Sequence, residues 1–554
     1  MLEEKKSGSG SIILQASILA AAGIVSRIIG LLYRSPLSGI IGDLGLGYYQ
    51  SAYNYYTIIL LISSYSIPSA ISKVIAQKLG VGEYKNAHRL FKGALFYVLV
   101  IGAVASAFLY FAAGLFVEEA AIPVLRTFAP TIFFYGMLGV LRGYFQAHKS
   151  MVQTSISQIL EQIANAIVSV SAAYILINMN RYTAAISANA TDEVQRAVRG
   201  AIGSALGTGT GVLVALVFMF LIYLRAHKEI KGRVLTDTHT EVDSAGTIIK
   251  TITLIVTPFI MSTALYNLSS VINNKLYTSI YPEIMNLDTV VTSSRYGIFS
   301  GKALTISNIP IAFASAMASA MIPSIAQLIA KKENDEARSK IGLAVKTTML
   351  ISIPCAVGLF VLAGPVTLLL FPNAIDNFDL SRYTLMALSV SVIFYALSTL
   401  NSSILQGLGK VNTPIINAVI ALGIQTVTAV LLLFYTNLDV YSIAIANTLY
   451  SLIMAILNQM ATRRAIGYKQ EIKRTFILPL LASLIMGGAA YGVYRLAYFL
   501  CHSMRIAVIP AIIVAIPVYF VALLLVKGVN EEELKSFPKG RLIVKVAKKL
   551  RLLR

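Results

Sequence analysis

The sequence predicts an all-α protein that crosses a membrane many times, both from its composition and from the length of its apolar runs. Of its 554 residues, 56% are hydrophobic and only 13% are charged, and the mean hydropathy is +0.73. Soluble proteins of this length are far more polar. About fourteen runs approach the 20 apolar residues that span a bilayer as a helix. We expect spans near residues 12–36, 48–72, 90–116, 123–146, 152–178, 201–224, 248–274, 293–329, 340–370, 382–407, 413–435, 440–462, 475–500 and 505–526.

Charge alternates between the connections that join these spans. The odd-numbered connections are poor in Lys and Arg, and VEEAAI at 117–122 is acidic, whereas the even-numbered ones are basic and include Arg142 and Lys149. Cytoplasmic loops of membrane proteins carry such an excess of Lys and Arg. We therefore expect a plasma-membrane protein with cytoplasmic termini and with the connection 178–200 outside. The same pattern explains the net charge of +21, so nucleic acid is not an expected partner.

Two pairs of similar segments indicate an internal repeat. IPSAISKVIAQK at 67–78 resembles IPSIAQLIAKK at 322–332, and YFQAHKSMVQTSISQ at 144–158 resembles ILQGLGKVNTPIINA at 404–418. Both pairs are separated by roughly 250–260 residues, which favours a duplicated six-helix unit with parallel repeats. The alternative is that all junctions between amphipathic helices and loops look alike.

The repeat predicts four parts of the chain. An N-terminal lobe would occupy residues 1–235, a C-terminal lobe 236–465, and two additional spans 466–530. The tail at 531–554 alternates Leu, Ile and Val with Lys and Arg, which is typical of a basic amphipathic helix on an anionic cytoplasmic leaflet. A solvated tail that only sets the topology is an equal alternative.

Motifs for catalysis are absent from the sequence. It has no G-x-x-x-x-G-K-[ST] phosphate loop, no G-x-S-x-G elbow and no His–carboxylate cluster with metal-ligand spacing. The two cysteines, Cys355 and Cys501, are far apart and predict neither a disulfide framework nor a metal site. We therefore expect no enzyme, no metal and no cofactor; a coupling ion, Na⁺ or H⁺, stays open.

Arginines within the first span are the strongest functional signal. Arg27 and Arg34 lie in an otherwise apolar run with no acidic residue between Ile12 and Gly42. A guanidinium in a membrane span costs about 2.5–3.5 kcal/mol and is expected to face a cavity or a partner. Lys302 in the eighth span, near Arg295, adds positive charge from the second half, unless these two residues lie in a longer external loop. A net positive cavity favours an anionic substrate, and a diphosphate fits it best.

Other polar residues complete the candidate site. Glu161 is a carboxylate well inside span 5, where it would bind a coupling ion or pair with Arg27; the alternative is a structural hydrogen bond to Gln158 or to a neighbouring helix. Asn54 and Asn274 add polar groups at the start of span 2 and the end of span 7. Tyrosines surround Asn54, and we expect these to be interfacial belt residues rather than sugar contacts. Glycines follow the first span and predict a hinge: Gly39, Gly42 and Gly45.

Several of these segments, in this order, resemble a known family. SRIIGLLYR at 26–34, IGDLGLGYYQ at 41–50, IPSAISKVIAQ at 67–77 and the stretch from LRGYFQAHKSM to SQILEQI at 141–163 are similar to the SpoVB/YtgP-type polysaccharide transport proteins. These belong to the MOP exporter superfamily and are similar to the MurJ-type lipid II flippases. The resemblance is densest over the first 180 residues.

The resemblance implies two six-helix lobes around a central cavity, plus two helices that form a groove for a lipid tail. It implies alternating access that moves undecaprenyl-diphosphate-linked saccharide outward, with the peptidoglycan precursor lipid II as the first candidate. The family's first-helix arginines correspond to Arg27 and Arg34, and Lys302 is the best match to its eighth-helix cation. The basic residue of the second helix in MurJ proteins is absent, which leaves the cargo open between lipid II and another lipid-linked polysaccharide.

Two other functions stay open. One is a cation-coupled drug or metabolite antiporter, although such proteins usually carry an acidic residue in the first helix and this chain does not. The other is a membrane scaffold that recruits cell-wall synthases. For the flippase we expect a monomer whose partners are the lipid-linked substrate, anionic membrane lipids contacted by the tail, and cell-wall synthesis proteins.

Overall fold

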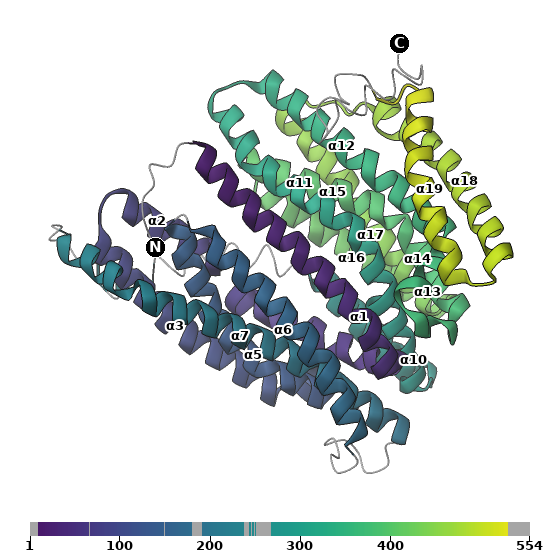
Figure 1. The fold of residues 1–554 in the computed structure, drawn as a ribbon, viewed down its shortest axis with the longest axis horizontal. Helices are drawn as coiled ribbons and strands as arrows, with labels where there is room; N and C mark the ends of the chain where they lie inside the picture. The colour runs from purple at the N-terminus through teal and green to yellow at the C-terminus, as the bar shows by residue number, and fades with distance from the viewer. Residues whose placement is uncertain are drawn as a thin grey trace. The chain divides into compact units, whose positions relative to one another are not determined.

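The computed structural model describes residues 9–65, 67–148, 150–179, 191–237 and 267–529, together with six positions between 243 and 250. Within these residues the secondary structure is helical, without strands (Figure 1). The prediction of an all-α protein is confirmed. The tail at 531–554 and most of the predicted seventh span lie outside the described residues.

The described residues contain eleven helices that are long and apolar enough to cross a membrane. This confirms a membrane protein with many spans but not the count of fourteen. One of the eleven, Ala21–Ser63, covers two predicted spans, because the helix continues on both sides of a kink. α11 (Leu304–Ala330) corresponds to the predicted eighth span and is not among the eleven.

Contacts within the chain define two compact units, Met1–Gly297 and Ile298–Arg554. The lobe boundaries expected from the repeat, at residues 235 and 465, stay a prediction. Unit 1 contains α1 (Ser9–Leu60), η1 (Leu61–Tyr65), α2 (Ile67–Gly80), α3 (Tyr84–Phe111), α4 (Ala113–Phe116), η2 (Glu119–Ala121), α5 (Ile122–Ala147), α6 (Met151–Asn178), α7 (Asp192–Thr236), a helical segment at 267–275, η3 (Leu276–Ile280), α9 (Tyr281–Met285) and α10 (Thr289–Tyr296).

A kink at Gly42 divides α1 into two helical parts. Gly42 has φ 69° and ψ −179°, a backbone conformation that is essentially confined to glycine. The sequence predicts a glycine-rich turn between two spans, and the structure places the turn at this one residue. α1 therefore supplies two consecutive helices to unit 1.

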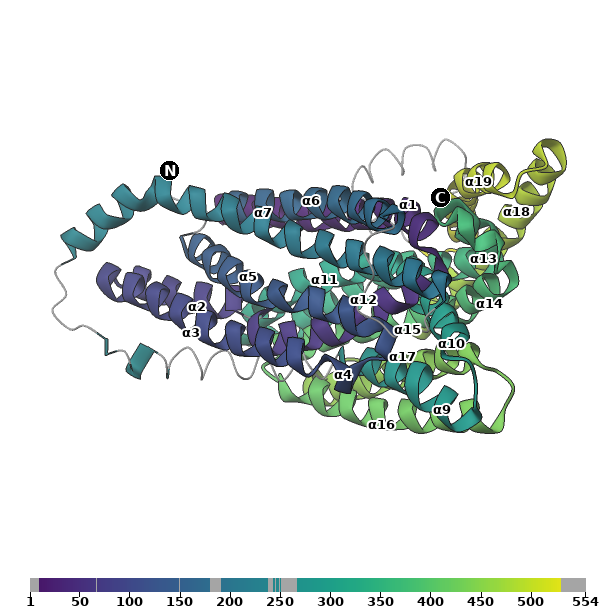
Figure 2. The ribbon, with the colours of Figure 1, turned by 90° about the horizontal axis from the view of Figure 1, so that it is seen from below.

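Glycines form the seam between α6 and α7, which run side by side (Figure 2). Gly203, Gly207 and Gly211 recur every four residues along α7. A Cβ atom at Gly207 would lie 2.0 Å from Ser169 Oγ, and one at Gly203 would lie 2.3 Å from the backbone nitrogen of Ala173. Small residues at this spacing allow two membrane helices to pack backbone against backbone.

Several helices of unit 2 match the predicted spans closely, whereas the predicted spans 340–370 and 382–407 each consist of two helices. Its two C-terminal helices pack against each other (Figure 1), and the hydroxyl of Tyr519 donates a hydrogen bond to the carbonyl of Leu350 at 2.8 Å. The segments are η4 (Gly297–Ala303), α11, α12 (Asn334–Val361), α13 (Ala363–Leu370), η5 (Pro372–Ile375), α14 (Phe378–Ser389), α15 (Ser391–Gly407), α16 (Asn412–Tyr435), α17 (Val440–Ile466), η6 (Lys473–Ile477), α18 (Leu478–Cys501) and α19 (Met504–Leu525).

Candidate functional site

Arg27 and Arg34 lie two helical turns apart on the first part of α1, and therefore on one face. Arg27 is exposed and Arg34 is half-buried. The guanidinium of Arg34 is close to the side chains of Tyr33, Tyr49 and Tyr53, and it hydrogen-bonds to Tyr33. The structure thus surrounds one of the two predicted cations with phenol hydroxyl groups.

The tyrosines at the start of the predicted second span are interior residues of unit 1. Tyr55 and Tyr56 are only 7% and 2% exposed, and Tyr56 stacks on Phe128 with ring centroids 4.7 Å apart. Tyr53, which is half-buried, stacks on Tyr49 at 5.7 Å. The prediction that these residues form an interfacial belt is wrong for Tyr55 and Tyr56, because the kink at Gly42 turns this part of α1 into the unit.

Glu161 is paired with Arg142 of α5. The two side chains are 2.8 Å apart and only 16% and 7% exposed, respectively, and Arg142 also donates to Ser157 Oγ at 2.9 Å. The expected partner, Arg27, is not the one that the structure shows. Arg142 was expected in a basic connection, but it lies inside α5 and is buried. Binding of a coupling ion at Glu161 stays a prediction, and Gln158 lies half-buried on the same helix.

The positions of unit 2 that correspond to Arg142 and Ser157 in the repeat carry neutral polar side chains. In the second pair of repeated segments Tyr144 corresponds to Ile404, so Arg142 corresponds to Ser402 and Ser157 to Asn417. Asn417 donates to Asn458 Oδ1 at 2.9 Å, and Asn458 donates to Ser402 Oγ at 2.8 Å. The corresponding helices of unit 2, α15 and α16, are thus joined through Asn458 of α17, whereas α5 and α6 of unit 1 are joined directly. Buried polar contacts at corresponding positions are consistent with the expected duplication.

Asn54 and Asn274 hold neighbouring helices together. Asn54 donates to the hydroxyl of Tyr296 at 2.8 Å, and Asn274 donates to Ser51 Oγ at 2.8 Å. Both bonds join the second part of α1 to residues 267–296 of the same unit. These amides are therefore committed to helix packing in this structure.

Lys302 is fully buried in the helical segment η4 of unit 2. Arg295 is half-buried in the last turn of α10. Both cations lie in helical segments rather than in a loop, because α10 begins at Thr289 and η4 follows it from Gly297. A role for Lys302 beside the arginines of α1 stays a prediction.

The three predicted hinge glycines differ in their surroundings. Gly42 alone of the three has a positive φ. A Cβ atom at Gly45 would lie 3.1 Å from the carbonyl oxygen of Ala197, whereas one at Gly39 would meet nothing within 4 Å. The most crowded glycine of this stretch is Gly47, where a Cβ atom would lie 2.0 Å from the carbonyl oxygen of Ser293. Movement at this turn stays a prediction.

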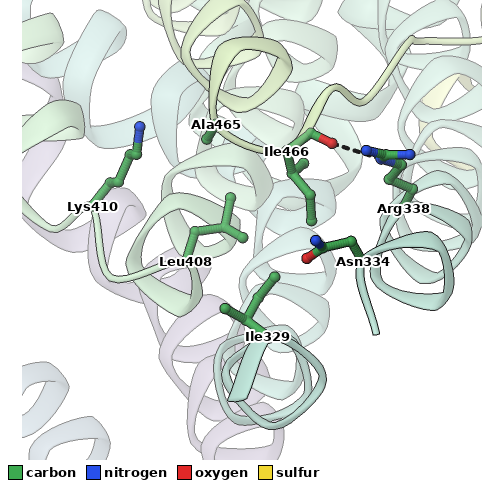
Figure 3. Close-up of a pocket in the computed structure, with 7 residues that line it drawn as sticks. All are labelled: Ile329, Asn334, Arg338, Leu408, Lys410, Ala465 and Ile466. Atoms are coloured by element: carbon green, nitrogen blue, oxygen red, sulfur yellow. Dashed lines mark hydrogen bonds between the residues drawn. The ribbon is translucent and has the colours of Figure 1, made fainter. Parts of the chain in front are cut away.

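A cavity of about 260 Å³ lies in unit 2 at the ends of α11 and α17 and the start of α12 (Figure 3). Arg338 forms one side, where its Nε donates to the carbonyl oxygen of Ile466 at 2.6 Å. Its Nη1 also lies 2.8 Å from the carboxylate of Asp335. Figure 3 shows Ile329 and Leu408 between Arg338 and Lys410. The cavity belongs to the basic connections that the sequence predicts on the cytoplasmic side.

Metal ligands are not gathered anywhere in the part of the chain that the structure describes: no three His, Cys, Asp or Glu side chains are placed to hold an ion there.

The polar groups that the sequence did not identify as interior residues are Arg142 and Glu118. Arg142 has a signal that could have found it, since it lies within the predicted span 123–146.

A family model described as "Lipid II flippase MurJ" matches residues 84–509. The chain belongs to this family. The matched range begins after α1, so the match does not include Arg27 and Arg34 and assigns no role to them. The resemblance to the MOP exporters is confirmed, and the family is one of transporters and flippases.

Full-length relatives cover nearly the whole chain. Lipid II flippase MurJ of Bacillus subtilis (strain 168) is 24% identical over 525 residues, which are 90% of this chain and 92% of the relative. Stage V sporulation protein B of the same organism is 22% identical over 548 residues, 95% of this chain and 98% of the relative.

Solved structures share the fold. A lipid II flippase MurJ in an inward closed conformation matches with a TM-score of 0.66 at 15% identity, covering 91% of this chain and 97% of the other. An outward-facing multidrug resistance MATE family transporter of the MOP superfamily matches with a TM-score of 0.57 at 16% identity, covering 82% and 95%. The MurJ-type fold is therefore shared with transporters of different cargo.

Proposed function

We propose that this member of the MurJ family flips an undecaprenyl-diphosphate-linked saccharide, with lipid II as the first candidate, across the plasma membrane by alternating access. The observation that supports it is a pair of arginines on one face of the first membrane helix of a chain that belongs to a flippase family. A cation placed within a span is costly. It is therefore expected where a substrate anion compensates for the cost.

The diphosphate of the cargo would bind at Arg27 and Arg34. A guanidinium and a phosphate charge about 4 Å apart attract each other by about 4 kcal/mol at an effective dielectric constant of 20. Paired N–H donors also match the geometry of phosphate oxygens. Tyr33, which hydrogen-bonds to Arg34, would hold the guanidinium in place before the cargo arrives.

The test is translocation of fluorescent lipid II in proteoliposomes. We expect Arg34→Ala and Arg27→Ala each to lower the rate at least tenfold, and Arg34→Lys to retain part of it, because a lysine keeps the charge but not the paired donors. Arg126→Ala is the matched control: Arg126 is an arginine of the same unit that lies over the Tyr110 ring. Intact transport by Arg27→Ala would disprove the assigned role, provided that all variants elute as folded protein.

A second candidate cargo is another lipid-linked polysaccharide. It is supported by the full-length similarity to stage V sporulation protein B and by Tyr53 and Asn54 where MurJ-type proteins were expected to carry a basic residue. Mass spectrometry of lipids that co-purify from native membranes distinguishes the two cargoes. Dye efflux in a host that lacks its drug pumps would instead indicate an antiporter.

The remaining expectations belong to this proposal. They are a monomer with cytoplasmic termini, a tail on the anionic leaflet, coupling to Na⁺ or H⁺, and contact with cell-wall synthesis proteins. Intact function in the cell after combined loss of Arg27, Arg34 and Lys302 would instead favour a non-transporting scaffold.

A further inference from the structure

Glu118 occupies an unusual place for an acidic residue. It lies just after α4 in residues 112–122, which we call the connection 112–122. This segment leads from the candidate span Tyr84–Phe111 into the candidate span Glu119–Ala147. Its side chain is half-buried, and the hydroxyl of Ser293 lies 2.8 and 2.7 Å from its two carboxylate oxygens. Ser293 is itself fully buried on α10. The connection is thereby joined to a helix 175 residues further along the chain.

α10 packs against α1 without space for side chains at this point. A Cβ atom at Gly47 would lie 2.0 Å from the carbonyl oxygen of Ser293, and one at Gly297 would lie 2.2 Å from the carbonyl oxygen of Asp43. The bond from Ser293 to Glu118 therefore extends a close two-helix contact to a third element. Separation of α10 from this end of unit 1 has to break it.

The charges around Glu118 come from several elements. Lys275 is the basic group that favours its ionised form. Acidic groups surround the neighbouring Tyr48 of α1: Glu118 itself, Asp288 at the start of α10 and Glu193 in the first turn of α7. Burial raises the pKa of Glu118 from 4.5 to about 7, against the opposing effects of Ser293 and Lys275. The carboxyl group is therefore close to half-protonated at neutral pH.

We propose that Glu118 is a proton-binding site that fastens the connection 112–122 to α10, so that proton release loosens this end of unit 1. A carboxyl group packed against protein binds a proton more tightly than one in water. Because the packed arrangement binds the proton more tightly than the hydrated one, protonation stabilises the packed arrangement. Rising pH favours an arrangement in which the carboxylate is hydrated. This inference does not rest on the proposed cargo, because it concerns the protein alone.

The raised pKa of Glu118 predicts how strongly opening depends on pH and how the midpoint changes in a variant. With a pKa of about 7 when packed and an ordinary value of 4.5 when hydrated, the loosened population rises about tenfold between pH 6 and pH 8 and then levels off. Removal of the Ser293 hydroxyl should move the midpoint to higher pH, since this bond favours the carboxylate. By the sequence's charge pattern this end faces the outside, so the site would sense external pH.

The experiment is hydrogen–deuterium exchange of the full chain in nanodiscs, read in peptides that cover 112–122 and 286–297 and corrected for the intrinsic effect of pH on exchange. We expect tenfold faster opening at pH 8 than at pH 6 in the wild type and slow, pH-independent opening in Glu118→Gln. Glu119→Gln, at the exposed neighbouring residue, is the matched control and should keep the wild-type profile. Ser293→Ala should shift the midpoint upward.

The opposite outcomes would overturn the proposal. They are a wild-type pH profile in Glu118→Gln, fast exchange of that variant at every pH, or an unchanged midpoint in Ser293→Ala. An infrared titration gives a second measurement: a protonated carboxyl band should be lost near pH 7 in the wild type and be missing in Glu118→Gln. A band that persists in the variant assigns the proton to another group and rejects the site.

Discussion

The buried pair of Arg142 and Glu161 gives a prediction that can be worked from the structure. Its nitrogen and oxygen are 2.8 Å apart, and the side chains are 7% and 16% exposed, so water screens the pair weakly. Removal of one member of a buried pair costs about 3–5 kcal/mol, because the other charge stays buried without compensation. We expect Glu161→Gln to lower the free energy of unfolding by this amount.

The two single variants should not be equivalent. Arg142 keeps its charge under all usable conditions, and its remaining bond to Ser157 does not neutralise it. Glu161 is the more exposed member of the pair, at 16% against 7%, so its charge is better hydrated when the partner is removed. Arg142→Met should therefore cost less than Glu161→Gln.

The assay is thermal and steric-trap unfolding of the purified chain in micelles. The double variant Arg142→Met/Glu161→Gln completes a double-mutant cycle with the two single variants. The double variant should recover most of the loss, since no uncompensated charge remains. Glu161→Gln within about 0.5 kcal/mol of the wild type would refute the reasoning, because changes of that size are ordinary for surface sites. Strict additivity of the two single variants would refute it as well.

Three further predictions concern close packing and buried amides. Gly47→Ala should reduce the folded yield severely, because its Cβ would lie 2.0 Å from a backbone oxygen, while Gly39→Ala, with nothing within 4 Å, should be neutral in the same size-exclusion assay. Gly207→Ala should likewise separate α6 from α7, where its Cβ would meet Ser169 Oγ at 2.0 Å, and Gly23→Ala, in open space, is its control in thermal unfolding. Asn458→Ala should destabilise unit 2 by about 1–3 kcal/mol, because it removes the bonds that Asn417 and Ser402 each make to Asn458. An unchanged unfolding midpoint would contradict the role assigned to this amide.

The ends of the two last helices were predictable from the sequence alone. The predicted spans 475–500 and 505–526 agree closely with α18 (Leu478–Cys501) and α19 (Met504–Leu525). A span is set by a local quantity, the length of apolar chain that a bilayer accommodates. The turn at Gly42 was predictable for a similar reason, since a glycine-rich stretch between apolar runs marks the place where the backbone can leave the helix.

The partners of the polar residues were decided only by the tertiary structure. Glu161 could have paired with Arg27 or bound an ion, and the choice of Arg142 depends on which face of α5 meets α6. Tyr55 and Tyr56 were expected at a membrane surface, and the direction of the chain after Gly42 buries them instead. Apolar length fixes whether a segment enters the membrane, but the rotation of each helix and the identity of its neighbours fix what its polar side chains touch. Those depend on packing between residues far apart in the chain, as Glu118 and Ser293 show.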